Sequence, residues 1–133
     1  MTGDLDVAES RLAAALKELG NEPLITSLQG LLHARRNQPD SALAYVRRAL
    51  DSPRSFGHTH HTYYQIACVY AVLGDKRSAM AWLERSIETG FACWPFFQLD
   101  PNLENLRDDS EFKQLVSHLE RTYSSVKVRG ASF

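Results

Sequence analysis

Small and apolar residues recur along the chain in a three-residue cluster with helical spacing. Each cluster has a small residue, an apolar residue four positions later and a small residue three positions after that, so all three fall on one helix face. A turn-forming pair such as Asn37-Gln38 or Gly74-Asp75 stands four to five residues ahead. The clusters are Ala8/Leu12/Ala15, Ala42/Val46/Ala49 and Ala79/Leu83/Ser86. They begin 34 and then 37 residues apart, and this period predicts stacked helical hairpins.

Capping and turn residues set the bounds of the predicted helices. Pro23 and Pro39 suit the first turn of a helix, and Asp75 suits an N-cap. Pro101 would break a regular helix after residue 94, so a short helical segment at 94–99 is expected there, with a turn from Asp100 to Leu106. The other expected helices are 4–19, one from 23, one from 39, 61–73, one from Asp75 to Gly90, and 109–123 with a capping box at Asp108 and Glu111.

These elements predict one all-α domain over residues 1–123. It divides into a half repeat at 3–20, a repeat at 23–51, a repeat at 60–90 and a degenerate closing segment at 91–123. Trp94, Phe96 and Phe97 form an aromatic cluster that we expect to be buried under the last helix. Residues 124–133 have little apolar content and are expected to be a mobile tail.

Composition narrows the classes of function. The formal net charge of −1 offers no global attraction to nucleic acid or to an acidic membrane surface, so neither is expected as a partner. Two cysteines among 133 residues are too few for a disulfide framework, and no secretory signal opens the chain. A reducing, cytoplasmic location is therefore expected.

The repeat pattern resembles the tetratricopeptide repeat family. Residues 61–90 match best, with leucine-like, small and aromatic positions in the first helix and the small-apolar-small cluster in the second. The matching residues are Ile66, Ala67, Tyr70, Gly74, Ala79, Leu83 and Ser86. The resemblance implies a short α-α superhelix, a solenoid of stacked antiparallel helical hairpins with a C-terminal capping helix. Residues 91–115 look like the segment that closes such arrays in multidomain bacterial regulatory proteins. Met1–Leu19 looks like the second helix of a repeat without its first helix. It is expected either to cap the array or to belong to a repeat that begins in a longer protein.

In this family the first helix of each hairpin lines the concave face, and the resemblance implies a partner-binding surface there. The corresponding positions are Leu24, Ser27, Leu31, Ala34, His61, Tyr64, Cys68 and Ala71. They lack the Lys, Arg and Asn that clamp acidic chaperone tails, and they suit an apolar helix or extended peptide. The same groove could instead be filled by the chain's own C-terminal helix, by the tail ending at Phe133 or by a second copy. The alternative function is therefore a spacer or homodimerisation module of a larger regulatory protein.

The remaining candidate sites are weaker. His58, His60 and His61, with Cys68 two turns away, could bind zinc or copper, although the loop supplies no frame for three or four ligands. Five arginines at 35, 36, 47, 48 and 54 could attract phosphate or an acidic partner, although such a cluster is more often the solvated outer face of a hairpin. No nucleophile with a base, phosphate loop or paired carboxylates is present, so we expect neither catalysis nor a cofactor or metal.

Overall fold

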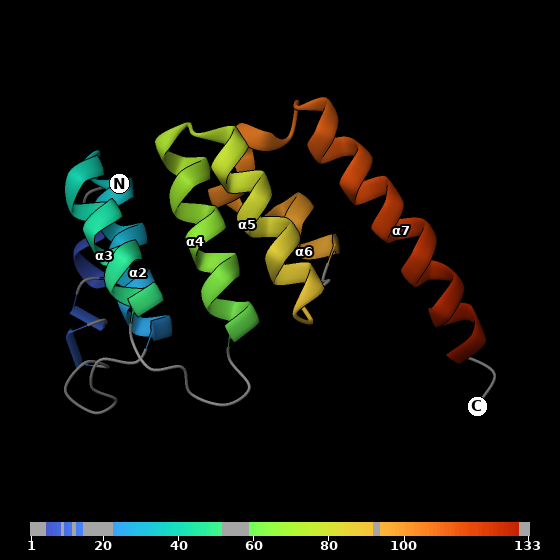
Figure 1. Cartoon of the computed structure of the whole chain (residues 1–133), viewed down its shortest axis with the longest axis horizontal. Helices are drawn as coiled ribbons and strands as arrows, with labels where there is room; N and C mark the ends of the chain where they lie inside the picture. The colour runs from blue at the N-terminus through green and yellow to red at the C-terminus, as the bar shows by residue number, and fades with distance from the viewer. Residues whose placement is uncertain are drawn as a thin grey trace.

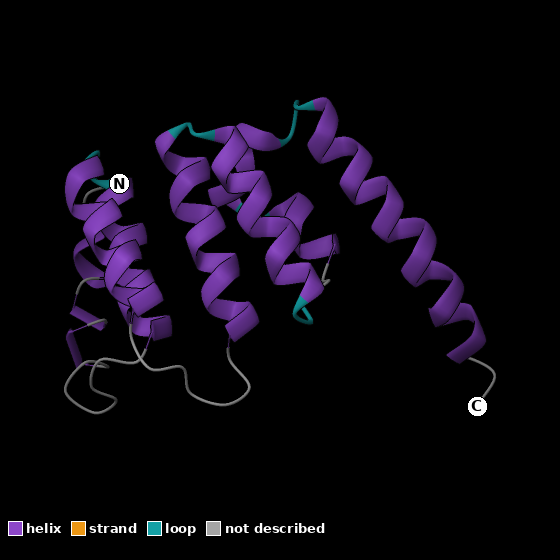
Figure 2. Ribbon diagram, viewed as in Figure 1, coloured by secondary structure: helices purple, strands orange, loops and turns teal. Residues whose placement is uncertain are grey.

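The structure is a computed structural model that describes residues 5–8, 10–11, 13–14, 23–51, 59–91 and 94–130. Every regular element in those ranges is a helix (Figure 2). Of the predicted first helix, residues 5–8, 10–11 and 13–14 are described and are helical. His58, Cys93 and Phe133 lie outside the described residues. None of the described helices is both long enough and apolar enough to span a membrane.

Two antiparallel helical hairpins form the body of the molecule. The first pairs α2 (Pro23–Arg35) with α3 (Pro39–Asp51), and the second pairs α4 (Thr59–Leu73) with α5 (Lys76–Glu88). The two hairpins stack through α2 and α4 (Figure 1). The prediction of an all-α array of stacked hairpins is confirmed.

Local signals explain where these helices begin and turn. Pro23 and Pro39 open α2 and α3, as predicted. The side chain of Asp75 caps α5 by accepting a 3.1 Å hydrogen bond from the backbone N–H of Ser78. Between α4 and α5, Gly74 takes a φ of +87°, a left-handed conformation that glycine adopts without strain.

The small residues of the repeat pattern allow the helices to approach closely. Ala42, Ala79 and Leu83 are each 0 % exposed. A Cβ atom on Gly30 would lie 3.1 Å from the carbonyl oxygen of Ala42, so α2 and α3 cross where Gly30 has no side chain. The pattern therefore identifies the packing face of both hairpins correctly.

The closing segment consists of α6 (Trp94–Leu99), the 3₁₀ helix η1 (Pro101–Leu106) and α7 (Ser110–Gly130). The short helix at 94–99 is confirmed. The capping-box prediction was wrong by one residue, because the Asp109 carboxylate, and not that of Asp108, accepts from the N–H groups of Glu111 and Phe112 at 2.9 and 3.3 Å.

The last helix is longer than predicted. Its backbone continues to Gly130, whereas the end was expected at Tyr123. The sequence between these residues contains neither proline nor glycine, so nothing in it breaks the backbone hydrogen bonds of a helix. The low apolar content of residues 124–130 was therefore not a signal for the end of the helical backbone.

The aromatic cluster was only partly predicted. Phe97 is 0 % exposed and packs with Leu103, Leu106 and α7, as expected. Phe96, by contrast, is 45 % exposed. Consecutive residues of a helix point in different directions, so Phe96 is less buried than Phe97, although its ring centroid lies 5.8 Å from that of Tyr64.

Candidate partner-binding groove

The inner face of the second hairpin is covered by the closing segment. Tyr64 is 3 % exposed, and Cys68 and Ala71 are 0 % exposed. They belong to one buried cluster with Phe97, Leu103 and Leu106, all from α6 and η1. The expectation that Tyr64, Cys68 and Ala71 line an open groove is therefore corrected, because α6 and η1 fold back over them.

Polar contacts with Asp100, which joins α6 to η1, fix this cover in place. The carboxyl group of Asp100 accepts a hydrogen bond from the hydroxyl of Tyr64 and contacts Cys68 Sγ at 3.8 Å. Its other oxygen accepts from the backbone N–H of Asn102 at 2.9 Å, which caps η1. Arg107 Nη2 donates to the Asp100 carbonyl at 2.8 Å. Asp100 is thus bonded through its carboxyl group and its carbonyl, whereas Nε of Arg107 is buried without a hydrogen-bond partner.

Burial changes the acidity of two groups in this cluster. Loss of solvent raises the pKa of Tyr64 far above its ordinary value of 10.0, and the neighbouring Cys68 and Asp100 raise it further. Loss of solvent also raises the pKa of the Cys68 thiol above its ordinary value of 9.0, with a further contribution from the negative charge of Asp100. The folded state therefore favours the neutral form of both groups.

This chemistry predicts loss of stability at alkaline pH. A raised folded-state pKa contributes stability that is fully present below the ordinary pKa and is lost as pH rises above it. The free energy of unfolding should fall above about pH 9, by up to about 1.4 kcal/mol per pH unit for each group. Urea unfolding at a series of pH values measures the slope, which should be shallower above pH 10 in Tyr64→Phe. Equal stability of the parent protein at about pH 8 and pH 11 would contradict the burial of these groups.

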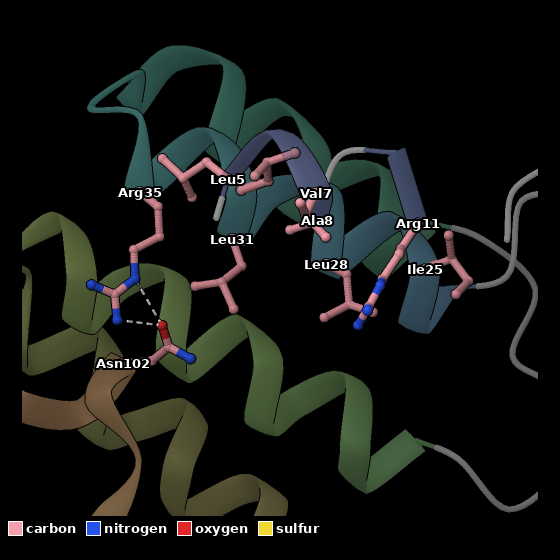
Figure 3. Close-up of a pocket in the computed structure, with 10 residues that line it drawn as sticks. Leu5, Val7, Ala8, Arg11, Ile25, Leu28, Leu31, Arg35 and Asn102 are labelled. Carbon is pink, nitrogen blue, oxygen red and sulfur yellow. Dashed lines mark hydrogen bonds between the residues drawn. The ribbon is translucent and has the colours of Figure 1, made fainter. Parts of the chain in front are cut away.

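The first hairpin leaves a groove open between α2 and the described residues 5–8 and 10–11 of the first helix. Its volume is about 480 Å³, and most of its lining is aliphatic (Figure 3). Leu28 and Leu31 of α2 face Val7 and Ala8 across it. The lining residues are Leu5, Val7, Ala8, Arg11, Ile25, Leu28, Leu31, Leu32, Arg35 and Asn102.

Two arginines mark the groove. In Figure 3, Arg11 lies near Ile25, and Arg35 lies beside Asn102 at the opposite end of the row of aliphatic side chains. Arg35 donates to Asn102 Oδ1 from Nε at 2.9 Å and from Nη2 at 2.6 Å. These two bonds tie α2 to η1 and hold the guanidinium in one orientation.

The structure distributes the predicted site residues over three environments. Leu31 lines the open groove. Ser27 and Ala34 are 0 % and 4 % exposed, and the hydroxyl of Ser27 donates to the carbonyl of Leu24 at 2.7 Å. His61 is half-buried, with its ring centroid 5.2 Å from that of Phe91. Leu24 is also half-buried and is not part of the groove lining.

Sequence reasoning missed most of the residues that line the groove. Leu28, Leu31 and Arg35 follow the i, i+3, i+7 spacing of one helix face, and this signal could have been recognised. The contributions of Arg11 and Asn102 could not, because each comes to the groove from a part of the sequence outside α2, and only the fold places them there. Of the three candidate metal-binding histidines, His60 and His61 are described, and their ring centroids lie 4.2 Å apart, whereas His58 lies outside the described residues; among the described residues no group of three or more potential metal ligands occurs.

Comparisons with known proteins agree with this architecture. Residues 60–89, which span α4 and α5, match the tetratricopeptide repeat family. Tetratricopeptide repeats are generally non-catalytic protein-interaction units. The resemblance carried by Ile66, Gly74 and Ala79 is therefore confirmed for this hairpin.

A curated relative extends the similarity beyond one repeat. The chain is 23% identical over 95 residues to a chloroplastic protein of Arabidopsis thaliana. The aligned region covers 71% of this chain and 28% of that protein, so the chain spans less than a third of the length of the relative. No solved structure matches the chain.

Proposed function

We propose that this chain is a non-catalytic protein–protein interaction module that binds a partner segment in the groove between residues 5–11 and α2. The open aliphatic groove beside a tetratricopeptide repeat is the observation that carries the proposal. A helix or extended peptide with aliphatic or aromatic anchors fits such a groove, because removing those side chains from water drives binding.

The chemistry of the lining supports binding over catalysis. The groove is lined by aliphatic residues, two arginines and one asparagine. Among these described residues there is no carboxylate, histidine, hydroxyl or thiol that could act as a nucleophile or general base. The volume of about 480 Å³ is enough for a few side chains of a partner.

A second function, homodimerisation, is favoured by an apolar patch on α6. Phe96 and Leu99 are 45 % and 76 % exposed, and their spacing places them on one side of the helix. A dimer that is disrupted by Leu99→Arg and unaffected by Leu28→Arg would support this alternative. A cytoplasmic location and membership of a bacterial regulatory protein remain predictions from the sequence.

A pull-down with matched variants tests the groove. Leu28→Arg places a charge among aliphatic side chains in the groove, and Leu99→Arg places the same charge on the exposed side of α6. Leu28→Arg should reduce capture of a specific partner at least about tenfold, a loss of about 1.4 kcal/mol, and Leu99→Arg should not. Circular dichroism should show that both variants keep the helical content of the parent. Equal capture by the parent and Leu28→Arg would remove the groove from consideration.

A further inference from the structure

The open groove carries positive charge that no acidic residue of its described lining balances. Arg11 and Arg35 are among the described lining residues, and none of those residues is Asp or Glu. Neighbouring Arg36 differs, because its Nη2 pairs with the Asp6 carboxylate at 3.0 Å. For Arg35, the described residues supply only the neutral amide oxygen of Asn102. The charge of the Arg35 guanidinium is thus held at the groove without a counterion from the described chain.

The contact with Asn102 prepares Arg35 for a ligand. Nε and Nη2 both donate to one amide oxygen, so the guanidinium is already oriented before a partner arrives. Its Nη1 group remains available to a carboxylate, for which planar guanidinium donors are well suited. Because Asn102 turns its oxygen to Arg35, its amide nitrogen lies on the side away from the guanidinium (Figure 3).

A second hollow continues the groove past Arg35. This hollow has a volume of about 380 Å³ and is lined by Leu5, Arg35, Arg36, Asn37 and Gln38. Leu5 and Arg35 line both hollows, so Arg35 stands along the path of a bound segment and not outside it. From Ile25 to Arg35 the groove follows α2 for about 15 Å, at 1.5 Å of rise per residue.

We propose that the partner segment is acidic as well as apolar: aliphatic or aromatic anchors fill the groove at Leu28 and Leu31, and an Asp or Glu of the partner pairs with Arg35. This inference rests on the proposed function, since it names the partner class of the same groove. Charge complementarity carries it. A basic or purely apolar segment would leave the Arg35 guanidinium at the contact without a counterion, which disfavours binding.

Selection from a random peptide library displayed on phage tests the inference without knowledge of the natural partner. The full chain is immobilised as the parent, as Arg35→Gln and as Arg47→Gln. Arg47 is a matched control because it is exposed on α3 and is not part of the groove lining. The parent and Arg47→Gln should select apolar peptides enriched in Asp and Glu. Arg35→Gln should lose that enrichment and bind the selected peptides about tenfold more weakly.

The outcomes separate this inference from the proposed function. Two results would overturn the proposal of an acidic partner segment: selection of apolar peptides without enrichment in Asp and Glu, or an enrichment that persists in Arg35→Gln. Either result would leave the proposed partner binding in the groove intact. Selection of peptides that match this chain's own sequence would also overturn the acidic partner segment, and would favour a second copy of this chain as the occupant of the groove. Two results would overturn both proposals. One is that the selected peptides bind Leu28→Arg as well as they bind the parent. The other is that the parent enriches no peptides beyond those that bind a support without protein.

Discussion

Phe97→Ala should lower the free energy of unfolding by about 3–5 kcal/mol, the usual cost of removing a fully buried aromatic ring. Phe97 is 0 % exposed and packs between the inner face of α4 and the first turns of α7. Its ring also stacks on Tyr64 at 5.6 Å between centroids. The truncation should therefore detach the closing segment from α4 before it affects α2 and α3.

Exposure of Cys68 reports that detachment directly. In a Cys93→Ser background Cys68 is the remaining thiol, and it is 0 % exposed in the folded protein. A thiol reagent should label it slowly in the parent and many times faster in Phe97→Ala. Circular dichroism of the same samples distinguishes local detachment from complete unfolding. Equally slow labelling in Phe97→Ala would show that α6 and η1 do not cover α4.

The adjacent ring is the matched control. Phe96 has the same side chain but is 45 % exposed, so Phe96→Ala should cost about 1 kcal/mol or less. Labelling of Cys68 should then remain close to that of the parent. A large effect from Phe96→Ala and a small one from Phe97→Ala would reverse the assignment of the buried ring.

Asp100→Ala should lower the free energy of unfolding by about 2–4 kcal/mol. The substitution removes the acceptor of the buried Tyr64 hydroxyl, which costs about 1–3 kcal/mol for an unsatisfied buried group. It also removes the cap on η1, worth about 1 kcal/mol, where Asp100 accepts from the N–H of Asn102. Chemical denaturation of the purified variant measures the change.

A double-mutant cycle shows whether Tyr64 and Asp100 act together. Tyr64→Phe removes the hydroxyl, so its cost in the Asp100→Ala background should be smaller than in the parent. Asp108→Ala serves as the control, since Asp108 is exposed in the turn between η1 and α7 and should change stability little. Strictly additive effects of Tyr64→Phe and Asp100→Ala would contradict a direct hydrogen bond between the two side chains.

The helices that the sequence predicted well are those whose ends and contacts are determined by nearby residues. Pro23 and Pro39 fix the first turns of α2 and α3, Asp75 caps α5, and Ala42 and Ala79 mark close helix contacts. Each signal acts within a few residues of its effect. Even so, two adjacent carboxylates at 108 and 109 could not be distinguished as caps, because only the geometry of the turn decides between them.

The site was harder to predict because it depends on contacts between distant parts of the chain. Tyr64 meets Asp100 across 36 residues, and Arg35 meets Asn102 across 67. The repeat pattern identified the inner face of α4 but contained no sign that α6 and η1 would cover it. The groove that remains open lies along α2 instead, where Leu28 and Leu31 are among its lining residues.

Site-specific photo-crosslinking in the source cell tests the central claim that this groove binds a partner protein. A photoreactive benzoylphenylalanine is placed at Leu28 in the groove or, as a control, at Leu99, which is 76 % exposed on α6. After irradiation, mass spectrometry identifies covalent adducts. We expect an adduct with a specific protein from position 28 and not from position 99. Adducts from position 99 alone, or the same adducts from both positions, would contradict binding in the groove.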